Sequence, residues 1–194
     1  MAPVTCNPTK ISGPWQSGYV LDRHTISSTP TGDPYNPFDT KRTELGELVY
    51  QLKYGGKMEA LPIIVDTAEE FIRNGWQGLP GIDCIVPAPP SVSRKMQPVV
   101  ALARELAARL GLQTCEDAVV KVKRTEQMKN VTKTDRPAIL EEAIQLGTGA
   151  VKNKRVLLFD DLVESGSTLS RVTEVLLGEG GASAVHVLVL TRTK

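Results

Sequence analysis

The sequence predicts an α/β fold in which helices flank a parallel β-sheet on both faces. Residues 83–86, 155–159 and 184–190 form short, almost wholly apolar runs with the length and composition of buried strands. The stretches between these runs carry apolar residues every three or four positions, which is the spacing of one helix face. Strands that are apolar throughout are buried on both sides, and helices between them provide the crossovers that parallel pairing needs.

A helical pair, a strand and a third helix make up the first half of the predicted domain. Residues 42–54 repeat leucine and valine at helical spacing and end near two glycines. A second helix is expected over 62–73, because it starts on a proline, which suits a first turn. The strand at 83–86 runs into a rigid loop rich in proline. The helix over 99–110 is closed by Gly111.

The second half alternates strands and helices again. Residues 118–122 are expected to form a strand and residues 136–146 a helix. The strand at 155–159 leads directly into two aspartates, and a helix over 169–176 ends at a group of glycines before the last strand. Since ligands of such sheets bind beyond the carboxyl ends of the strands, the two loops after residues 86 and 159 are the places to search for a site.

The first 41 residues differ from the rest, and we expect an extended amino-terminal segment (1–41) ahead of an α/β domain (42–194). Six of the 13 prolines fall here, and residues 15–19 have the composition of a turn between two extended pieces. A disordered tail is usually poor in aromatics, whereas this segment carries several: Trp15, Tyr19, Tyr35 and Phe38. We therefore expect it to be ordered and to act as a hood over the site.

Composition excludes several classes of protein. The chain has 194 residues, 41% of them hydrophobic, and a formal net charge of +1, which argues against disorder and against a general nucleic-acid or membrane-surface binder. Its three cysteines are scattered and form no Cys-x-x-Cys pair. No apolar run reaches the length of a membrane span or of a signal peptide core. We therefore expect a cytoplasmic protein that has no membrane partner.

The residues with the clearest chemical pattern lie between 156 and 168. An apolar strand delivers Asp160 and Asp161, and a loop containing serine, glycine and threonine then opens a helix. Amide groups at a helix start bind anions, and a loop without lysine or arginine would hold a phosphate by these amides and its hydroxyls. The acids suit sugar hydroxyls, directly or through Mg²⁺. Because strand side chains alternate, the two acids should point to different sides.

Helix capping, a P-loop and a receiver domain each fit this pattern less well. Capping explains one acid and one hydroxyl but not the whole run. A P-loop is excluded, because no Gly-x-x-x-x-Gly-Lys-Ser/Thr occurs. A phosphoryl-accepting receiver domain would carry its paired aspartates after an early strand, whereas only 33 residues follow Asp161.

This pattern resembles the phosphoribosyl pyrophosphate (PRPP) signature of type I phosphoribosyltransferases, which have a Rossmann-like fold. The resemblance extends over about residues 42–194 and is strongest to the ComF-like (competence protein F-like) and amidophosphoribosyltransferase-like branch. Matching pieces are Leu-Lys-Tyr at 52–54, Val-Pro-Ala-Pro at 86–89 and Arg-Thr-Glu-Gln at 124–127. Two features depart from that branch: the chain lacks its paired-cysteine zinc ribbon, and the stretch after the proline loop is shortened to about 94–97.

The resemblance implies roles for three groups of residues. The 5′-phosphate would be bound by the loop residues Glu164, Ser165, Gly166, Ser167 and Thr168. Asp160 and Asp161 would lie near the ribose hydroxyls and Mg²⁺, and together with Glu164 they are the candidate catalytic residues. Glu164 is either a general base for the incoming acceptor or a solvent-facing acid. Pyrophosphate would be bound by Ala88, Pro89, Pro90, Ser91, Arg94, Lys123 and Arg124.

Two further details concern the pyrophosphate. The family often has a non-trans peptide in its pyrophosphate loop, for which Ala88–Pro89 is the natural candidate. Residues 121–136 contain six basic residues against two acidic ones. In the family this region is a flap that closes over pyrophosphate; otherwise it is a solvated surface loop. Nucleic-acid binding is disfavoured, because no aromatic residue lies between the basic ones.

The resemblance thus implies a Mg²⁺-dependent enzyme that transfers ribose 5-phosphate from PRPP to a nitrogen acceptor, a nucleobase or an amine, and releases pyrophosphate. The alternative is a non-catalytic PRPP- or nucleotide-binding protein, either a regulator or an accessory to DNA uptake. The expected partners are small molecules, and the resemblance is compatible with a homodimer.

Overall fold

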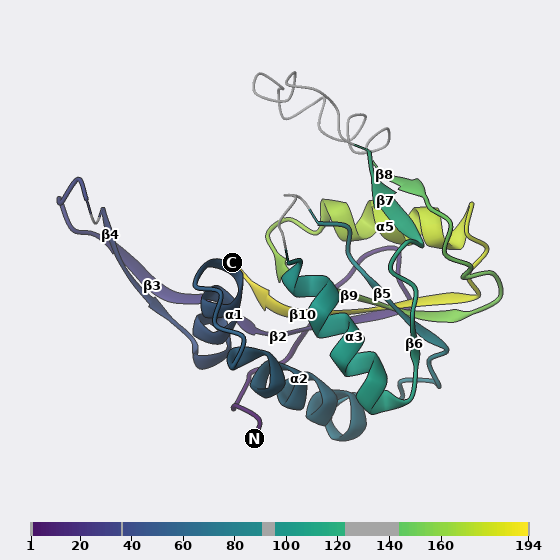
Figure 1. Cartoon of the computed structure of the whole chain (residues 1–194), viewed down its shortest axis with the longest axis horizontal. Coiled ribbons are helices and arrows are strands. Elements are labelled where there is room, and N and C mark those ends of the chain that lie inside the picture. The colour runs from purple at the N-terminus through teal and green to yellow at the C-terminus, as the bar shows by residue number, and fades with distance from the viewer. Residues whose placement is uncertain (1, 36, 91–95, 123–143, 194) are drawn as a thin grey trace.

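A six-stranded sheet forms the centre of the protein (Figure 1). The computed structural model describes residues 2–35, 37–90, 96–122 and 144–193. The strands lie in the order β1 (Thr9–Lys10), β2 (Ser17–Arg23), β10 (Ala184–Arg192), β9 (Arg155–Val163), β5 (Cys84–Pro87) and β6 (Gln113–Thr114). Every pairing in this sheet is parallel except that of β1 with β2. The predicted parallel α/β fold is therefore confirmed.

Helices cover both faces of the sheet, and strand alternation divides the core into two clusters. On β9, Leu157 and Phe159 pack against the face covered by α1 (Glu44–Tyr54), α2 (Ala60–Glu70) and α3 (Pro98–Leu110). Val156 and Leu158 pack on the other face, beneath α5 (Ser167–Leu177) and the small ribbon of β7 (Val119–Lys121) and β8 (Ile144–Leu146). Among the described residues, no helix has the length and apolar composition needed to cross a membrane.

Several element boundaries differ from those expected. Strand β9 continues to Val163, because it stays paired with β10 beyond Phe159, so both aspartates lie within a strand. Helix α2 begins at Ala60 and runs into a π-helical turn, η1 (Phe71–Gly75). The helix expected over 136–146 is wrong at its end, since residues 144–146 form β8, which pairs antiparallel with β7. Residues 136–143 lie outside the described part of the chain.

The amino-terminal residues contribute to the central sheet as well as to a projecting arm. The turn expected at 15–19 lies earlier than predicted, because residues 11–16 connect the antiparallel strands β1 and β2, and residues 17–19 already belong to β2. β2 then pairs in parallel with β10. The ring centroid of Tyr19 on β2 lies 5.1 Å from that of Phe71 and 5.1 Å from that of Trp76. The next two strands, β3 (Thr25–Pro30) and β4 (Phe38–Arg42), form a hairpin that extends away from the body (Figure 1). Strand β2 therefore joins the amino-terminal segment to the α/β domain.

We expect Leu157→Ala to lower the free energy of unfolding by about 2–5 kcal/mol, because it leaves a cavity in the centre of the sheet. Leu157 is fully buried on β9. Leu177→Ala is the matched control, since Leu177 is 37% exposed at the end of α5. This substitution should lower the free energy of unfolding by about 1 kcal/mol or less. Urea unfolding of both variants checks this, and equal losses would contradict the packing described here.

Candidate functional site

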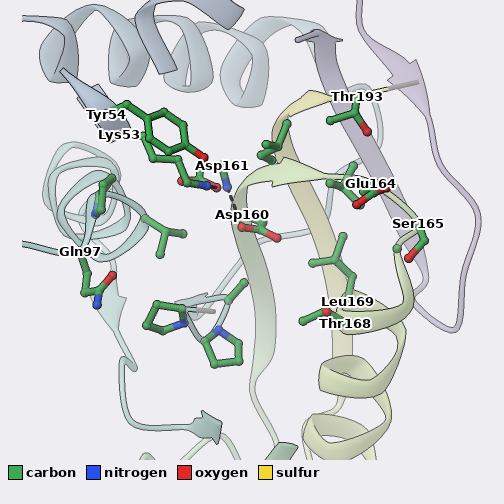
Figure 2. A pocket seen from close by; sticks show the side chains of 18 residues that line it. Lys53, Tyr54, Gln97, Asp160, Asp161, Glu164, Ser165, Thr168, Leu169 and Thr193 are labelled. Carbon is green, nitrogen blue, oxygen red and sulfur yellow. Dashed lines mark hydrogen bonds and ion pairs between the residues drawn. The ribbon is translucent and has the colours of Figure 1, made fainter. Parts of the chain in front are cut away.

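A cavity of about 400 Å³ opens at the carboxyl edge of the sheet, where β5 and β9 end. Its lining comes from the last turn of α1, the loop after β5, the start of α3, the end of β9 and the loop into α5. Figure 2 shows Lys53 and Tyr54 on one wall and Glu164 and Ser165 on the opposite wall, with the two aspartates between them. The two loops that the sequence singled out therefore border one cavity.

Asp161 is tied to the last turn of α1 by an ion pair. Lys53 Nζ donates to Asp161 Oδ1 at 2.8 Å, and the Asp161 side chain is only 8% exposed (Figure 2). From the adjacent strand, Thr191 Oγ1 donates to the backbone carbonyl of Asp161 at 3.1 Å. The Thr191 hydroxyl is itself in contact with His24, whose Nδ1 lies 3.1 Å from Oγ1. Asp161 is thus held by the protein on both its side chain and its backbone.

Asp160 has a different environment. It is half-buried, and its Oδ1 accepts from the backbone N–H of Asp161 at 2.8 Å. Burial and the neighbouring Asp161 carboxylate raise the pKa of Asp160 to about 7. The two acids both line the cavity but differ in their contacts: Asp161 is paired with a lysine, whereas Asp160 has a raised pKa. Among the described residues, no group of three His, Cys, Asp or Glu side chains is placed to hold a metal ion.

The loop after β9 turns sharply into α5. Gly166 is the residue before the helix, and its φ of +79° lies in the left-handed region that favours glycine. Ser165 Oγ lies 3.1 Å from Ser167 Oγ, and the amide of Ser170 donates to the Gly166 carbonyl at 2.9 Å. Glu164, Ser165, Gly166 and Thr168 line the cavity, whereas Ser167 is not among its lining residues in the described chain. The loop at 164–168 thus presents the free amides of a helix start together with hydroxyls and contains no lysine or arginine, which is a combination suited to an anion.

The predicted pyrophosphate residues are placed only in part. Ala88, Pro89 and Pro90 line the cavity beside the start of α3. The remaining candidates lie outside the described residues: Ser91, Arg94, Lys123 and Arg124. The peptide bond between Ala88 and Pro89 is trans, as are the other described peptide bonds, so a non-trans bond at this position is not present.

The amino-terminal segment does not cover this cavity. Of the described residues that line it, none comes from residues 1–41. Lys10 and Trp15 instead border a second, smaller cavity of about 300 Å³ on the other side of the loop at 163–166. Tyr35 and Phe38 lie on the hairpin, 98% and 55% exposed. The hood expectation is corrected accordingly, because edge pairing with β10 draws the first half of the segment into the sheet.

Sequence reasoning assigned no role to several residues that line the cavity. Lys53 and Tyr54 belonged to a piece that matched the family, yet only their place at the end of α1 reveals their contact with the site. Gln97 and Thr193 line it as well. Lys53 lies four residues after the buried Val49 and so on the same face of α1, and this position was a signal in the sequence that Lys53 turns toward the sheet.

Comparison with known proteins agrees with this fold. Residues 99–194 match the family model of the phosphoribosyl transferase domain. Glutamine PRPP amidotransferase from B. subtilis, solved with ADP and GMP, superimposes with a TM-score of 0.52 and 17% identity, over 79% of this chain and 34% of that chain. The structure of an allosteric regulatory enzyme of purine biosynthesis superimposes with a TM-score of 0.51 and 17% identity, over 79% of this chain and 33% of that chain. The chain therefore spans about a third of these proteins. No curated protein matches it.

The fold and the family match concern the same part of the chain. The mostly parallel sheet flanked by helices is the fold of type I phosphoribosyltransferases. The matched model covers nearly all of α3 and the whole of β9, α5 and β10, and so includes both aspartates and the loop at 164–168. The chain therefore has the type I phosphoribosyltransferase fold, and its second half resembles the phosphoribosyl transferase domain.

We expect Lys53→Met to lower the free energy of unfolding by about 2–4 kcal/mol, because it leaves the buried Asp161 carboxylate without its cation. Adding Asp161→Asn should restore much of the loss, since the amide is uncharged. Lys57→Met, at an exposed position three residues beyond α1, is the control and should cost about 0.5 kcal/mol or less. Thermal or urea unfolding measures these three variants and Asp161→Asn alone, and a loss in the double variant equal to the sum of the losses in Lys53→Met and Asp161→Asn would contradict the pairing.

Proposed function

We propose that the chain binds PRPP in the cavity of about 400 Å³ and transfers its ribose 5-phosphate group to a nitrogen nucleophile. One observation carries this proposal: an anion-binding loop and a carboxylate with a raised pKa line the same cavity, a few residues apart. A phosphate beside a sugar matches both parts. The phosphoribosyltransferase family match supports the same substrate.

In this proposal each group of residues has a separate task. The amides and hydroxyls at 164–168 bind the 5′-phosphate, and the Asp160 carboxylate meets the ribose hydroxyls. Mg²⁺ fits as a companion of the substrate, because Asp160 offers one carboxylate and PRPP the remaining oxygens. When bound, the ion would neutralise charge on the departing pyrophosphate. Asp161, already paired with Lys53, holds the end of β9 in position.

The proposed reaction breaks the bond between the ribose anomeric carbon and pyrophosphate and forms a bond to the acceptor nitrogen. The protein contributes mainly by holding the sugar in place while positive charge develops on it, which favours nearby carboxylates. Glu164 is exposed and lines the cavity, where it can take the proton that the acceptor nitrogen loses. Membership of the ComF-like branch and a homodimeric state belong to the same proposal.

The proposal predicts that the protein releases pyrophosphate from PRPP in the presence of Mg²⁺ and a suitable acceptor. The assay uses the full chain with a panel of purines, pyrimidines and amines, and measures pyrophosphate by an enzyme-coupled readout. Omission of Mg²⁺ should abolish release. Tight PRPP binding without turnover on any acceptor would contradict transfer and favour a PRPP-binding regulator.

We expect Gly166→Val to weaken PRPP binding at least tenfold, because a branched residue does not keep a φ of +79° and the loop backbone would have to change. A Cβ at this position meets no protein atom within 4 Å, so the effect comes from the backbone angle and not from a clash within the protein. Gly166→Asn is the matched variant and should bind more tightly than Gly166→Val, since asparagine visits the left-handed region. Calorimetric titration with PRPP and Mg²⁺ measures both, and wild-type affinity in Gly166→Val would contradict a phosphate site at this loop.

A further inference from the structure

The last residue of α1, Tyr54, presents an aromatic surface to the cavity. It is 59% exposed although it lines a cavity, and Figure 2 shows its ring extending from the α1 side toward the aspartates. Among the described lining residues it carries the only aromatic ring. The side chain before it, Lys53, is bound to Asp161, so the last turn of α1 is anchored to β9 directly beside this ring.

The ring is also supported from behind. Tyr50 lies four residues earlier on α1, and its ring centroid is 5.2 Å from that of Tyr54. Arg42, at the end of β4, places its guanidinium 3.6 Å from the centre of the Tyr50 ring, and its Nη1 donates to Glu47 at 3.3 Å. Contacts thus run from Arg42 on β4 through the Tyr50 ring to the tilted Tyr54 ring at the cavity, and they favour the position in which Tyr54 is seen. An aromatic ring with few available orientations binds a planar partner at low entropic cost.

The other residues that line the cavity can be assigned to the parts of the proposed substrates that they would meet. In the proposed function the loop at 164–168 and Asp160 bind the ribose 5-phosphate and residues 88–90 adjoin the pyrophosphate, which leaves the Tyr54 wall for the acceptor that joins the anomeric carbon. Ammonia or an amine must be uncharged to attack the anomeric carbon, and a small uncharged amine offers a phenol ring neither a cation nor a planar surface to bind. A planar heterocycle gains stacking energy on such a ring.

We propose that Tyr54 is a specificity-determining residue, on which a planar, aromatic nitrogen heterocycle stacks as the acceptor. This inference rests on the proposed function and names the acceptor class of that same site. It selects the nucleobase over the amine among the acceptors that the sequence left open.

The first test compares Tyr54→Ala, Tyr54→Phe and wild type in the pyrophosphate-release assay. Tyr54→Ala should raise the KM for a nucleobase acceptor roughly 5- to 100-fold, the range of one lost base–aromatic stack, while the Kd for PRPP stays within about twofold. Tyr54→Phe should keep the wild-type KM, because the ring remains. Tyr35→Ala is the matched control, since Tyr35 is 98% exposed on the hairpin.

A second measurement does not depend on turnover. Calorimetry compares the affinity for a nucleoside 5′-monophosphate with that for ribose 5-phosphate, and the ratio reports the contribution of the base. Wild type and Tyr54→Phe should bind the nucleotide more tightly by the same factor, and Tyr54→Ala should lose that preference. Equal ratios in wild type and Tyr54→Ala, or turnover with ammonia but with no base, would overturn the inference. Failure to bind PRPP or ribose 5-phosphate at all would instead refute the proposed function.

Discussion

The ion pair between Lys53 and Asp161 is the contact on which the arrangement of the site depends. It joins the carboxyl end of α1 to the carboxyl end of β9, 108 residues apart in the sequence. Because the Asp161 carboxylate is nearly buried, its charge needs this partner, and no second described ion pair of Asp161 replaces it. The pair holds the last turn of α1, which carries Tyr54, against the end of β9, while the neighbouring Asp160 lines the same cavity with a raised pKa.

The sheet supplies the rest of the geometry. Parallel pairing of β5, β9 and β10 brings their carboxyl ends to one edge, so loops distant in sequence border one cavity. Alternation along β9 packs Val156 and Leu158 on one face and Leu157 and Phe159 on the other. The same alternation gives two consecutive aspartates different surroundings, and this difference produces one paired carboxylate and one with a raised pKa.

The sequence predicted the parts of this structure that local patterns determine. Apolar runs located β5, β9 and β10, and Gly111 marked the end of α3 with a φ of +69°. The serine, glycine and threonine residues after Asp161 indicated a loop that opens a helix, whereas the bounds 164–168 and the phosphate role came from the family resemblance. The sequence did not predict that Lys53 reaches Asp161 or that β2 pairs with β10, because such long-range contacts depend on the tertiary fold. The hood expectation failed for the same reason: aromatic content indicated burial but not which surface Trp15 and Tyr19 would pack against.

The central claim is that the loop at 164–168 holds the 5′-phosphate of PRPP, and nuclear magnetic resonance tests it most directly. With Mg²⁺ present, titration of ¹⁵N-labelled protein with PRPP should shift the amides of Ser165, Gly166 and Thr168, and the ³¹P resonance of the 5′-phosphate should shift on addition of protein. The amide of Tyr35, on the distant hairpin, should stay unchanged. A 5′-phosphate resonance and loop amides that both remain at their free positions at saturating concentrations would contradict the account.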